Sequence, residues 1–310
     1  MKKIYSIAIA ILSCLCMSAQ MRVWVDGYVK YRIPLDQIDS ITFIKANEKA
    51  EPIGALTGKF SVSQDKQVMF SQGNLQHNPA TNVWRFADRQ YDIIGSANSK
   101  LSPTYNGWLD MFGWGTGNYA TLASNNSSHF GFYTEWGSNP IANGGNEANV
   151  WRALTRDEWG YLFNDRENAE ILFGLGRVEN VKGMIILPDN WVLPNGVSFV
   201  ASTTQGLAHE GKYYYTSGVD GYTHNVYTAD EWTIMEANGA VFLPAAGHRS
   251  SKSVGGVNGE GDYWSSTGDR DDGSSSIYAH YLSFTTNSVT PMNKHDNYYG
   301  RAVRLVRVVK

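Results

Sequence analysis

The sequence predicts an α+β domain of antiparallel strands with two short helices, preceded by a small β module. Three observations lead to this fold class. Two segments carry the capping signals of helix N-termini, several short segments alternate in side-chain character as half-buried strands do, and long stretches rich in Gly, Asn and Ser join them. Aromatic residues make up 13% of the chain, which predicts a packed core and excludes a disordered polymer.

Residues 1–19 have the pattern of a secretory signal peptide. Lys2 and Lys3 precede an apolar run over 4–15, and small residues follow at Ser18-Ala19. The run is shorter than the roughly 20 apolar residues that span a bilayer, and no second run is long enough. We therefore expect cleavage after Ala19 and no transmembrane segment in the mature chain.

An alternative form of processing is lipid attachment at Cys14, because Ile11-Leu12-Ser13-Cys14 resembles a lipobox. Cleavage after Ala19 is favoured, since Cys14 lies early in the segment. Both cysteines, Cys14 and Cys16, then leave with the signal, so the mature domain has no disulfide and no thiolate chemistry. The predicted location is outside the cytoplasm: secreted, periplasmic or on the outer cell surface.

Charge narrows the class of partner. Loss of Lys2 and Lys3 leaves 24 basic residues against 29 acidic ones, a net charge of −5. A mildly acidic chain without a basic cluster is not expected to bind nucleic acid or an anionic membrane.

Residues 20–45 are predicted to form a small β-hairpin leader module. Strand-like segments at 22–25 and 28–31 flank Asp26-Gly27, a strong two-residue turn signal, and 41–44 is predicted to be a third strand. The polar segment 46–53 is predicted to be a linker, and 54–310 the main domain.

The main domain is predicted to have short strands around two helices, with mostly loop over 94–149. The expected strands are 60–62, 67–70, 84–86, 183–187, 241–243, 263–267, 277–284 and 302–308. The segment 292–299 lies between two of them and is predicted to be a loop. In strand 263–267, alternation places Tyr263 and Trp264 on opposite faces, and Trp264 is expected to face the core.

Two capping boxes predict the helix starts, because a Thr hydroxyl and a Glu carboxylate three residues later satisfy free backbone N–H groups. The first helix is expected to run from Thr155 to about Asn168, and the second from Thr228 to Asn238-Gly239. The residues assigned this structural role are Thr155, Glu158, Trp159, Thr228, Glu231 and Trp232, with Trp264 in the core.

Five motifs together resemble a known family. They are Leu154-Thr155-Arg156-Asp157-Glu158-Trp159, Gly183-Met184-Ile185-Ile186-Leu187-Pro188-Asp189, Phe242-Leu243-Pro244-Ala245-Ala246-Gly247, Tyr263-Trp264-Ser265-Ser266-Thr267 and Gly300-Arg301-Ala302-Val303-Arg304-Leu305-Val306. Their order resembles the major paralogous domain family of bacterial surface proteins, related to formylglycine-generating (sulfatase-modifying) domains and to the variable proteins of diversity-generating retroelements. The resemblance covers residues 54–310 and implies a C-type-lectin-like fold.

The chain departs from the best-known chemistries of those relatives. The calcium-binding tripeptides of C-type lectins, Glu-Pro-Asn or Gln-Pro-Asp, do not occur, and Ser265-Ser266 follows Trp264 where the lectins have Asn-Asp. The formylglycine-generating enzymes use cysteines, which the mature chain lacks. No cofactor and no metal site is therefore expected, and the resemblance implies a scaffold.

Two segments are candidates for ligand contact. In the variable lectin-like proteins, ligand-contacting positions fall near the tryptophan motif and just before the final strand, which implies such roles for 269–272 and 293–299 here. The candidate residues are Asp269, Arg270, Asp271, Asp272, Lys294, His295, Asp296, Asn297, Tyr298 and Tyr299. Calcium binding at 269–272 is an alternative, but the spacing lacks the Gly and Glu of an EF-hand, and a solvated acidic turn is favoured.

These observations predict an exported, non-catalytic protein that recognises a protein or a glycan through its C-terminal loops. Aromatic and adaptable polar side chains together are typical of recognition loops. Two alternatives stay open: a carbohydrate-active enzyme with dispersed carboxylates, and a structural subunit of a surface assembly in which residues 21–44 dock. Neither a Gly-x-Ser-x-Gly elbow nor a phosphate-binding loop occurs to favour a particular enzyme class.

Overall fold

The computed structural model describes residues 20–25, 28–34, 52–126, 129, 132–210, 213–216, 218, 220–269 and 277–309. By its internal contacts the chain divides into two compact units, Met1–Ala50 and Glu51–Lys310. The expected domain boundary at residue 54 lies close to this division, and separate folding of the two parts stays a prediction.

The first unit contains a hairpin. Strands β1 (Gln20–Val25) and β2 (Tyr28–Pro34) pair antiparallel, with a register shift between Val23 and Trp24. The predicted signal peptide, the predicted turn residues Asp26-Gly27, the expected third strand at 41–44 and the predicted linker up to residue 51 lie outside the described residues.

The second unit is built mainly from short antiparallel strands, with two α-helices. Its strands are β3 (Phe60–Ser61), β4 (Gln67–Phe70), β5 (Leu75–Asn78), β6 (Val83–Phe86), β7 (Phe173–Val178), β8 (Val181–Ile186), β9 (Ala208–Glu210), β10 (Tyr213–Tyr215), β11 (Asn225–Tyr227), β12 (Val241–Pro244), β13 (His248–Ser250), β14 (Ser253–Gly255), β15 (Gly261–Asp269), β16 (Tyr278–Thr285), β17 (Ser288–Asp296) and β18 (Val306–Val308). At this level the predicted α+β class is confirmed.

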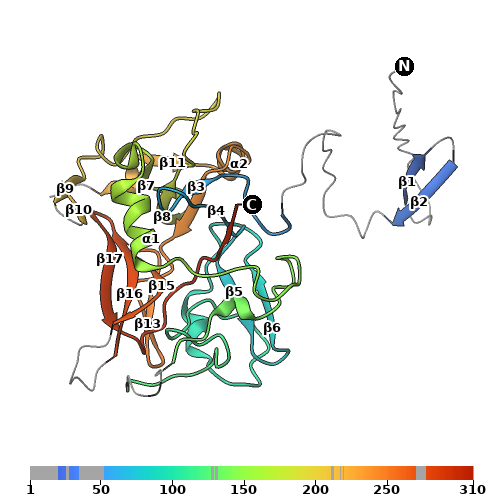
Figure 1. Cartoon of the computed structure of the whole chain (residues 1–310), viewed down its shortest axis with the longest axis horizontal. Coiled ribbons are helices and arrows are strands. Elements are labelled where there is room, and N and C mark those ends of the chain that lie inside the picture. Colours follow the sequence, from blue (N-terminus) through green and yellow to red (C-terminus); the bar gives the residue numbers. More distant parts are fainter. Residues whose placement is uncertain are drawn as a thin grey trace. The chain divides into compact units, whose positions relative to one another are not determined.

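The largest sheet has five strands in the order β15-β16-β17-β10-β9, and every neighbouring pair is antiparallel. A second sheet has the order β11-β7-β8-β12, in which β11 runs parallel to β7. A third, β18-β4-β3, pairs the last strand of the chain with the first two of this unit. Figure 1 shows β15, β16 and β17 side by side, in orange and red, with α1 packed against β17.

Both α-helices begin at the expected capping boxes. Thr155 caps α1 (Arg156–Gly160) and Thr228 caps α2 (Ala229–Ala237). In each case the Thr hydroxyl oxygen accepts from the backbone N–H of the Glu three residues later, and the Glu carboxylate accepts from the backbone N–H of the Thr. Trp159 and Trp232 are buried beneath them. The second helix ends at Asn238, followed by Gly239 at φ +91°, a conformation suited to glycine.

The first helix is shorter than expected. After α1 the chain makes one π-helical turn, η5 (Tyr161–Asp165), and Arg166 is already extended, so the end predicted near Asn168 is wrong. The side chain of Arg166 explains the stop. Its guanidinium is buried and donates to the carbonyl of Leu187 and the carboxylate of Asp189, a position that directs the backbone out of the helix.

Short helical turns occupy the connections, including the long segment predicted to be mostly loop. They are η2 (Gly95–Ser99), η4 (Trp136–Ser138), η6 (Ala169–Ile171) and η7 (Gly221–Thr223). The segment 94–149 otherwise holds turns and single bridges, and its own aromatic side chains Trp114 and Trp136 are buried in the core beneath it.

Several strand assignments from the sequence need correction. The segment 292–299 is not all loop, because β17 extends to Asp296 in the middle of the five-stranded sheet. The expected strand 302–308 is a ladder over Val306–Val308 alone; before it, Ala302 makes a single bridge to Tyr263. The expected strands do not include β5, β7, β9, β10, β11, β13 and β14. In β7 two glycines weaken the strand signal, and a Cβ at Gly176 would lie 2.5 Å from the Asn225 carbonyl oxygen.

Strand β15 separates two hydrophobic cores. Tyr263 belongs to the cluster around Phe60, Trp159 and Phe284, whereas Trp264 belongs to the cluster around Phe112 and Trp136. Both side chains are fully buried, so the expected core position of Trp264 is confirmed, and the face of the strand that carries Tyr263 contacts a core as well. Residues at the ends of β15 are therefore held on a rigid base.

Candidate functional site

One end of the five-stranded sheet brings together the two segments singled out in the sequence. Asp269 at the end of β15 is opposite Tyr278 at the start of β16, and Tyr278 is opposite Asp296 at the end of β17. The end of β15 and the end of β17 thus lie at the same end of the sheet, with β16 between them. The expected contact residues Arg270, Asp271 and Asp272 lie outside the described residues.

Asp269 forms an ion pair at this end of the sheet. The ammonium of Lys294 is 3.0 Å from the Asp269 carboxylate, and His280 Nε2 is 3.7 Å from the same oxygen. The hydrogen bond from Lys294 lowers the pKa of Asp269. The two candidate residues Asp269 and Lys294 therefore neutralise each other at the surface.

An aromatic group follows directly after β17. The rings of Tyr298 and Tyr299 stack with centroids 5.1 Å apart, and the His295 ring meets Tyr299 edge-on at 4.6 Å. Tyr298 and Tyr299 are half-buried, and Tyr299 packs against the core cluster of Trp264. The expectation that both tyrosines project from an exposed loop is therefore wrong for Tyr299.

Asn297 is a structural residue, contrary to the expectation that it contacts a ligand. It is fully buried, its N–H donates to the Ile277 carbonyl, and its own carbonyl accepts from Trp114. The turn is tied at this point to two other segments. Its neighbours His295 and Asp296 keep partly exposed side chains and lie 3.4 Å apart.

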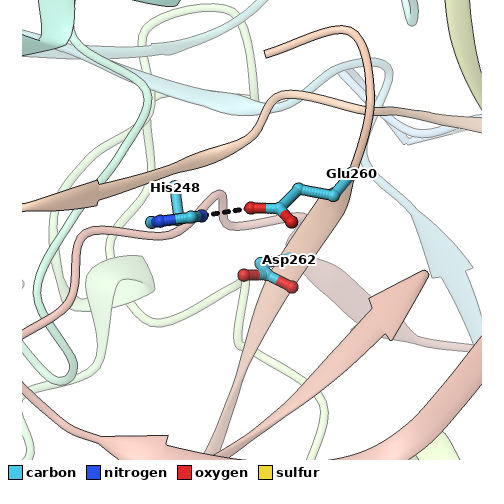
Figure 2. A group of neighbouring side chains, drawn as sticks. All are labelled: His248, Glu260 and Asp262. Atoms are coloured by element: carbon cyan, nitrogen blue, oxygen red, sulfur yellow. Dashed lines mark hydrogen bonds and ion pairs between the residues drawn. The ribbon is translucent and has the colours of Figure 1, made fainter. Parts of the chain in front are cut away.

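A second group of polar side chains, which the sequence reasoning missed, lies beside Tyr299. His248 on β13, Glu260 just before β15 and Asp262 within β15 point toward one another, as Figure 2 shows. One ligand atom from each lies within 4.8 Å of the other two, and His248 Nδ1 forms an ion pair with Glu260. The ring of His248 is 5.9 Å from that of Tyr299.

The backbone explains why these three side chains meet. Gly247 and Gly261 form a parallel bridge between the two segments, and His248, Glu260 and Asp262 are the residues next to the bridge. Alternation along a strand directs Glu260 and Asp262 to the same face. The spacing of Glu260 and Asp262 could have predicted two carboxylates on one face of a strand. Their contact with His248 could not be predicted, because it depends on the bridge between Gly247 and Gly261.

Arg301 joins the polar group to the aromatic group. Its guanidinium donates to Asp262 Oδ2 at 2.8 Å and lies 3.7 Å from the ring centroid of Tyr281. The same guanidinium is 4.8 Å from the Trp264 ring and 5.2 Å from the Tyr299 ring. The side chain is buried, so it supports the surface residues from below as a cation shared among three aromatic rings.

The protonation equilibria reflect this packing. Burial raises the pKa of Asp262, although the Arg301 charge opposes the shift. The hydrogen bond between His248 and Glu260 raises the pKa of the imidazole and lowers the pKa of the carboxyl, because it stabilises both charged forms. Burial lowers the pKa of His295, and the Arg301 charge acts in the same direction.

Comparison with protein-family models, with curated proteins and with solved structures found no match for this chain. The resemblance to the bacterial surface family therefore rests on the motifs quoted above. Within the described residues, no helix has the length and apolar character needed to cross a membrane.

Proposed function

We propose that this chain is an exported, non-catalytic binding protein whose main unit is a C-type-lectin-like domain, and that it recognises a protein or glycan ligand. The observation that carries the proposal is the set of partly exposed side chains His295, Tyr298 and Tyr299 on a buried base of Arg301 and Trp264. We call these three surface residues, with His248 beside them, the tyrosine face.

Rigidity favours a binding role for the tyrosine face. Tyrosine offers a large contact area with few rotatable bonds, so little conformational entropy is lost when it anchors a ligand. Here the backbone of the turn is held by buried Asn297, and Tyr299 is held by contacts with Arg301 and His295. The carboxylate of Asp296 lies 3.4 Å from the His295 imidazole and adds a charged group beside the aromatic rings.

The carboxylates around the tyrosine face favour binding over hydrolysis. Asp269 pairs with Lys294, Glu260 with His248 and Asp262 with Arg301. A glycoside hydrolase needs two carboxyl groups, one of them free to act as an acid at the scissile bond. Carboxylates held in ion pairs suit the orientation of a rigid surface better than proton transfer.

The lectin-like assignment is supported by the quoted motifs and by the burial of Trp264, which the resemblance places in the core. The proposed location outside the cytoplasm rests on the signal pattern of residues 1–19. Both are consistent with a domain that meets its ligand at or beyond the cell surface.

A screen of the mature chain, residues 20–310, on a glycan array and on a panel of immobilised extracellular proteins tests the proposal. For the tightest ligand found, Tyr298→Ala is expected to weaken binding at least tenfold, since an aromatic anchor contributes about 2 kcal/mol or more. Tyr298 is preferred to Tyr299 as the test position because Tyr299 also supports Arg301.

Tyr119→Ala is the matched control, because Tyr119 is 66% exposed and lies in a different segment. It is expected to leave the affinity unchanged. Equal affinities for the wild type and Tyr298→Ala would show that the tyrosine face is not the binding surface.

A further inference from the structure

We propose that His248, Glu260 and Asp262 form a binding site for a divalent transition-metal ion such as Zn²⁺. The three residues offer one imidazole nitrogen and two carboxylate oxygens, and these atoms lie within 4.8 Å of one another (Figure 2). The inference concerns the ion alone and does not depend on the ligand proposed for the tyrosine face.

The backbone beneath the three side chains is fixed by close packing. Gly247 has φ +80°, and a Cβ there would lie 2.3 Å from the Gly255 carbonyl oxygen. A Cβ at Gly261 would lie 2.0 Å from the Phe284 ring. The Gly247 N–H also donates to the Glu260 carbonyl at 2.8 Å, so the two segments that carry the ligands cannot drift apart.

The charge of the group is suited to a cation. Glu260 and Asp262 contribute two negative charges and Arg301 one positive charge, so the group carries a net charge of −1 when His248 is neutral. Arg301 donates to one oxygen of Asp262 and therefore acts as an orienting partner of a ligand, as hydrogen-bonded groups around metal sites commonly do. A divalent ion near this group is attracted despite the guanidinium.

An ion can reach the three ligand residues from solvent, and two of their side chains can rotate to bind it. The side chains of His248 and Glu260 are each 31% exposed, so an ion can reach them from solvent. Ligand atoms around a tetrahedral ion at 2.0–2.1 Å lie roughly 3.3 Å apart. A small rotation of these two side chains replaces their mutual hydrogen bond with two bonds to the ion, while Asp262 stays in place on Arg301.

The donor set predicts which ion binds. Nitrogen and carboxylate donors without thiolate suit Zn²⁺ and Co²⁺, whereas Ca²⁺ takes six to eight oxygen ligands and Mg²⁺ keeps most of its water. Three protein ligands leave one position of a tetrahedral ion for water. The site adjoins Tyr299, because the His248 ring is 5.9 Å from the ring of Tyr299.

Calorimetric titration of the untagged mature chain, stripped with a chelator, tests the site with Zn²⁺, Co²⁺, Ca²⁺ and Mg²⁺ alone. The expected result is one Zn²⁺ or Co²⁺ per chain with a Kd in the micromolar range, and a Tm that rises by several degrees at about 100 times Kd. Visible absorption of the Co²⁺ form is expected to report nitrogen and oxygen coordination.

His248→Ala and Glu260→Gln are each expected to weaken Zn²⁺ binding at least tenfold. Glu260→Gln keeps the size of the side chain and a hydrogen-bonding oxygen, so it serves if His248→Ala folds poorly. His224→Ala, which removes an exposed histidine elsewhere, is the matched control and is expected to bind as the wild type does. Absence of Zn²⁺ binding at about 1 mM, or unchanged binding in Glu260→Gln, would overturn the proposal.

Discussion

Trp264→Ala is expected to lower the free energy of unfolding by about 3–5 kcal/mol, the cost of removing a buried aromatic side chain. Trp264 is 1% exposed, and its ring meets Tyr281 at 5.7 Å and the Arg301 guanidinium at 4.8 Å. Its indole N–H also donates to the Phe112 carbonyl at 2.7 Å. The substitution leaves a cavity and a guanidinium without one of its rings, and the Phe112 carbonyl keeps only its bond from the Arg301 N–H.

Urea denaturation of the purified mature chain measures this effect. Trp264→Phe keeps much of the ring and is expected to cost about 1–3 kcal/mol, because it removes the indole hydrogen bond to the Phe112 carbonyl and leaves a smaller cavity. Tyr119→Ala changes an exposed aromatic residue and is expected to stay within about 0.5 kcal/mol of the wild type. A Trp264→Ala protein as stable as the Tyr119→Ala control would refute the position of Trp264 in the core.

Arg301→Met is expected to destabilise the fold by a similar amount, about 3–5 kcal/mol, because it strands a buried carboxylate. The side chains of Arg301 and Asp262 are 3% and 8% exposed, and they lie 2.8 Å apart. Met fills much of the volume of Arg, so the loss of charge and of cation–π contacts with Tyr281 and Trp264 dominates the change.

A double-mutant cycle separates the stranded charge from lost packing. Asp262→Asn, added to Arg301→Met, removes the unpaired carboxylate and is expected to recover part of the lost stability. The measurement is the free energy of unfolding of the wild type, the two single variants and the double variant. If the second substitution instead adds its full cost to the first, the two residues are not coupled and the ion pair beneath the tyrosine face is of no energetic consequence.

The features that could be predicted from the sequence are those with local causes. A capping box forms between residues three positions apart. The pairs Thr155 with Glu158 and Thr228 with Glu231 were therefore sufficient to predict where the two helices begin. The strand 277–284 was predicted from the alternating character of its side chains, and β16 occupies nearly the same residues. His295, Tyr298 and Tyr299 were predicted from a family resemblance and do lie together at the surface.

The features that could not be predicted depend on distant partners. The last part of strand β17 contains Asn293, Lys294, His295 and Asp296, which have little strand character. Their register is set by pairing with β16 across a two-residue turn at Thr286-Asn287. That turn lacks the Asn-Gly signal of the commonest hairpins.

The polar group beside the tyrosines shows the same limit. His248 meets Glu260 and Asp262 because two glycines bridge separate segments, and Tyr299 is held by an arginine whose burial depends on Asp262. Such contacts follow from tertiary structure, and the spacing of the residues along the chain does not reveal them.

The most direct test of the central claim is hydrogen–deuterium exchange of the mature chain with and without the tightest ligand from the array or protein panel. We predict slower exchange in peptides covering 293–299 and 248–262, which form the tyrosine face and its neighbours, and little change elsewhere. Protection confined to 113–139, where Tyr119 and Phe132 are exposed, would contradict the claim and move the binding surface to that segment.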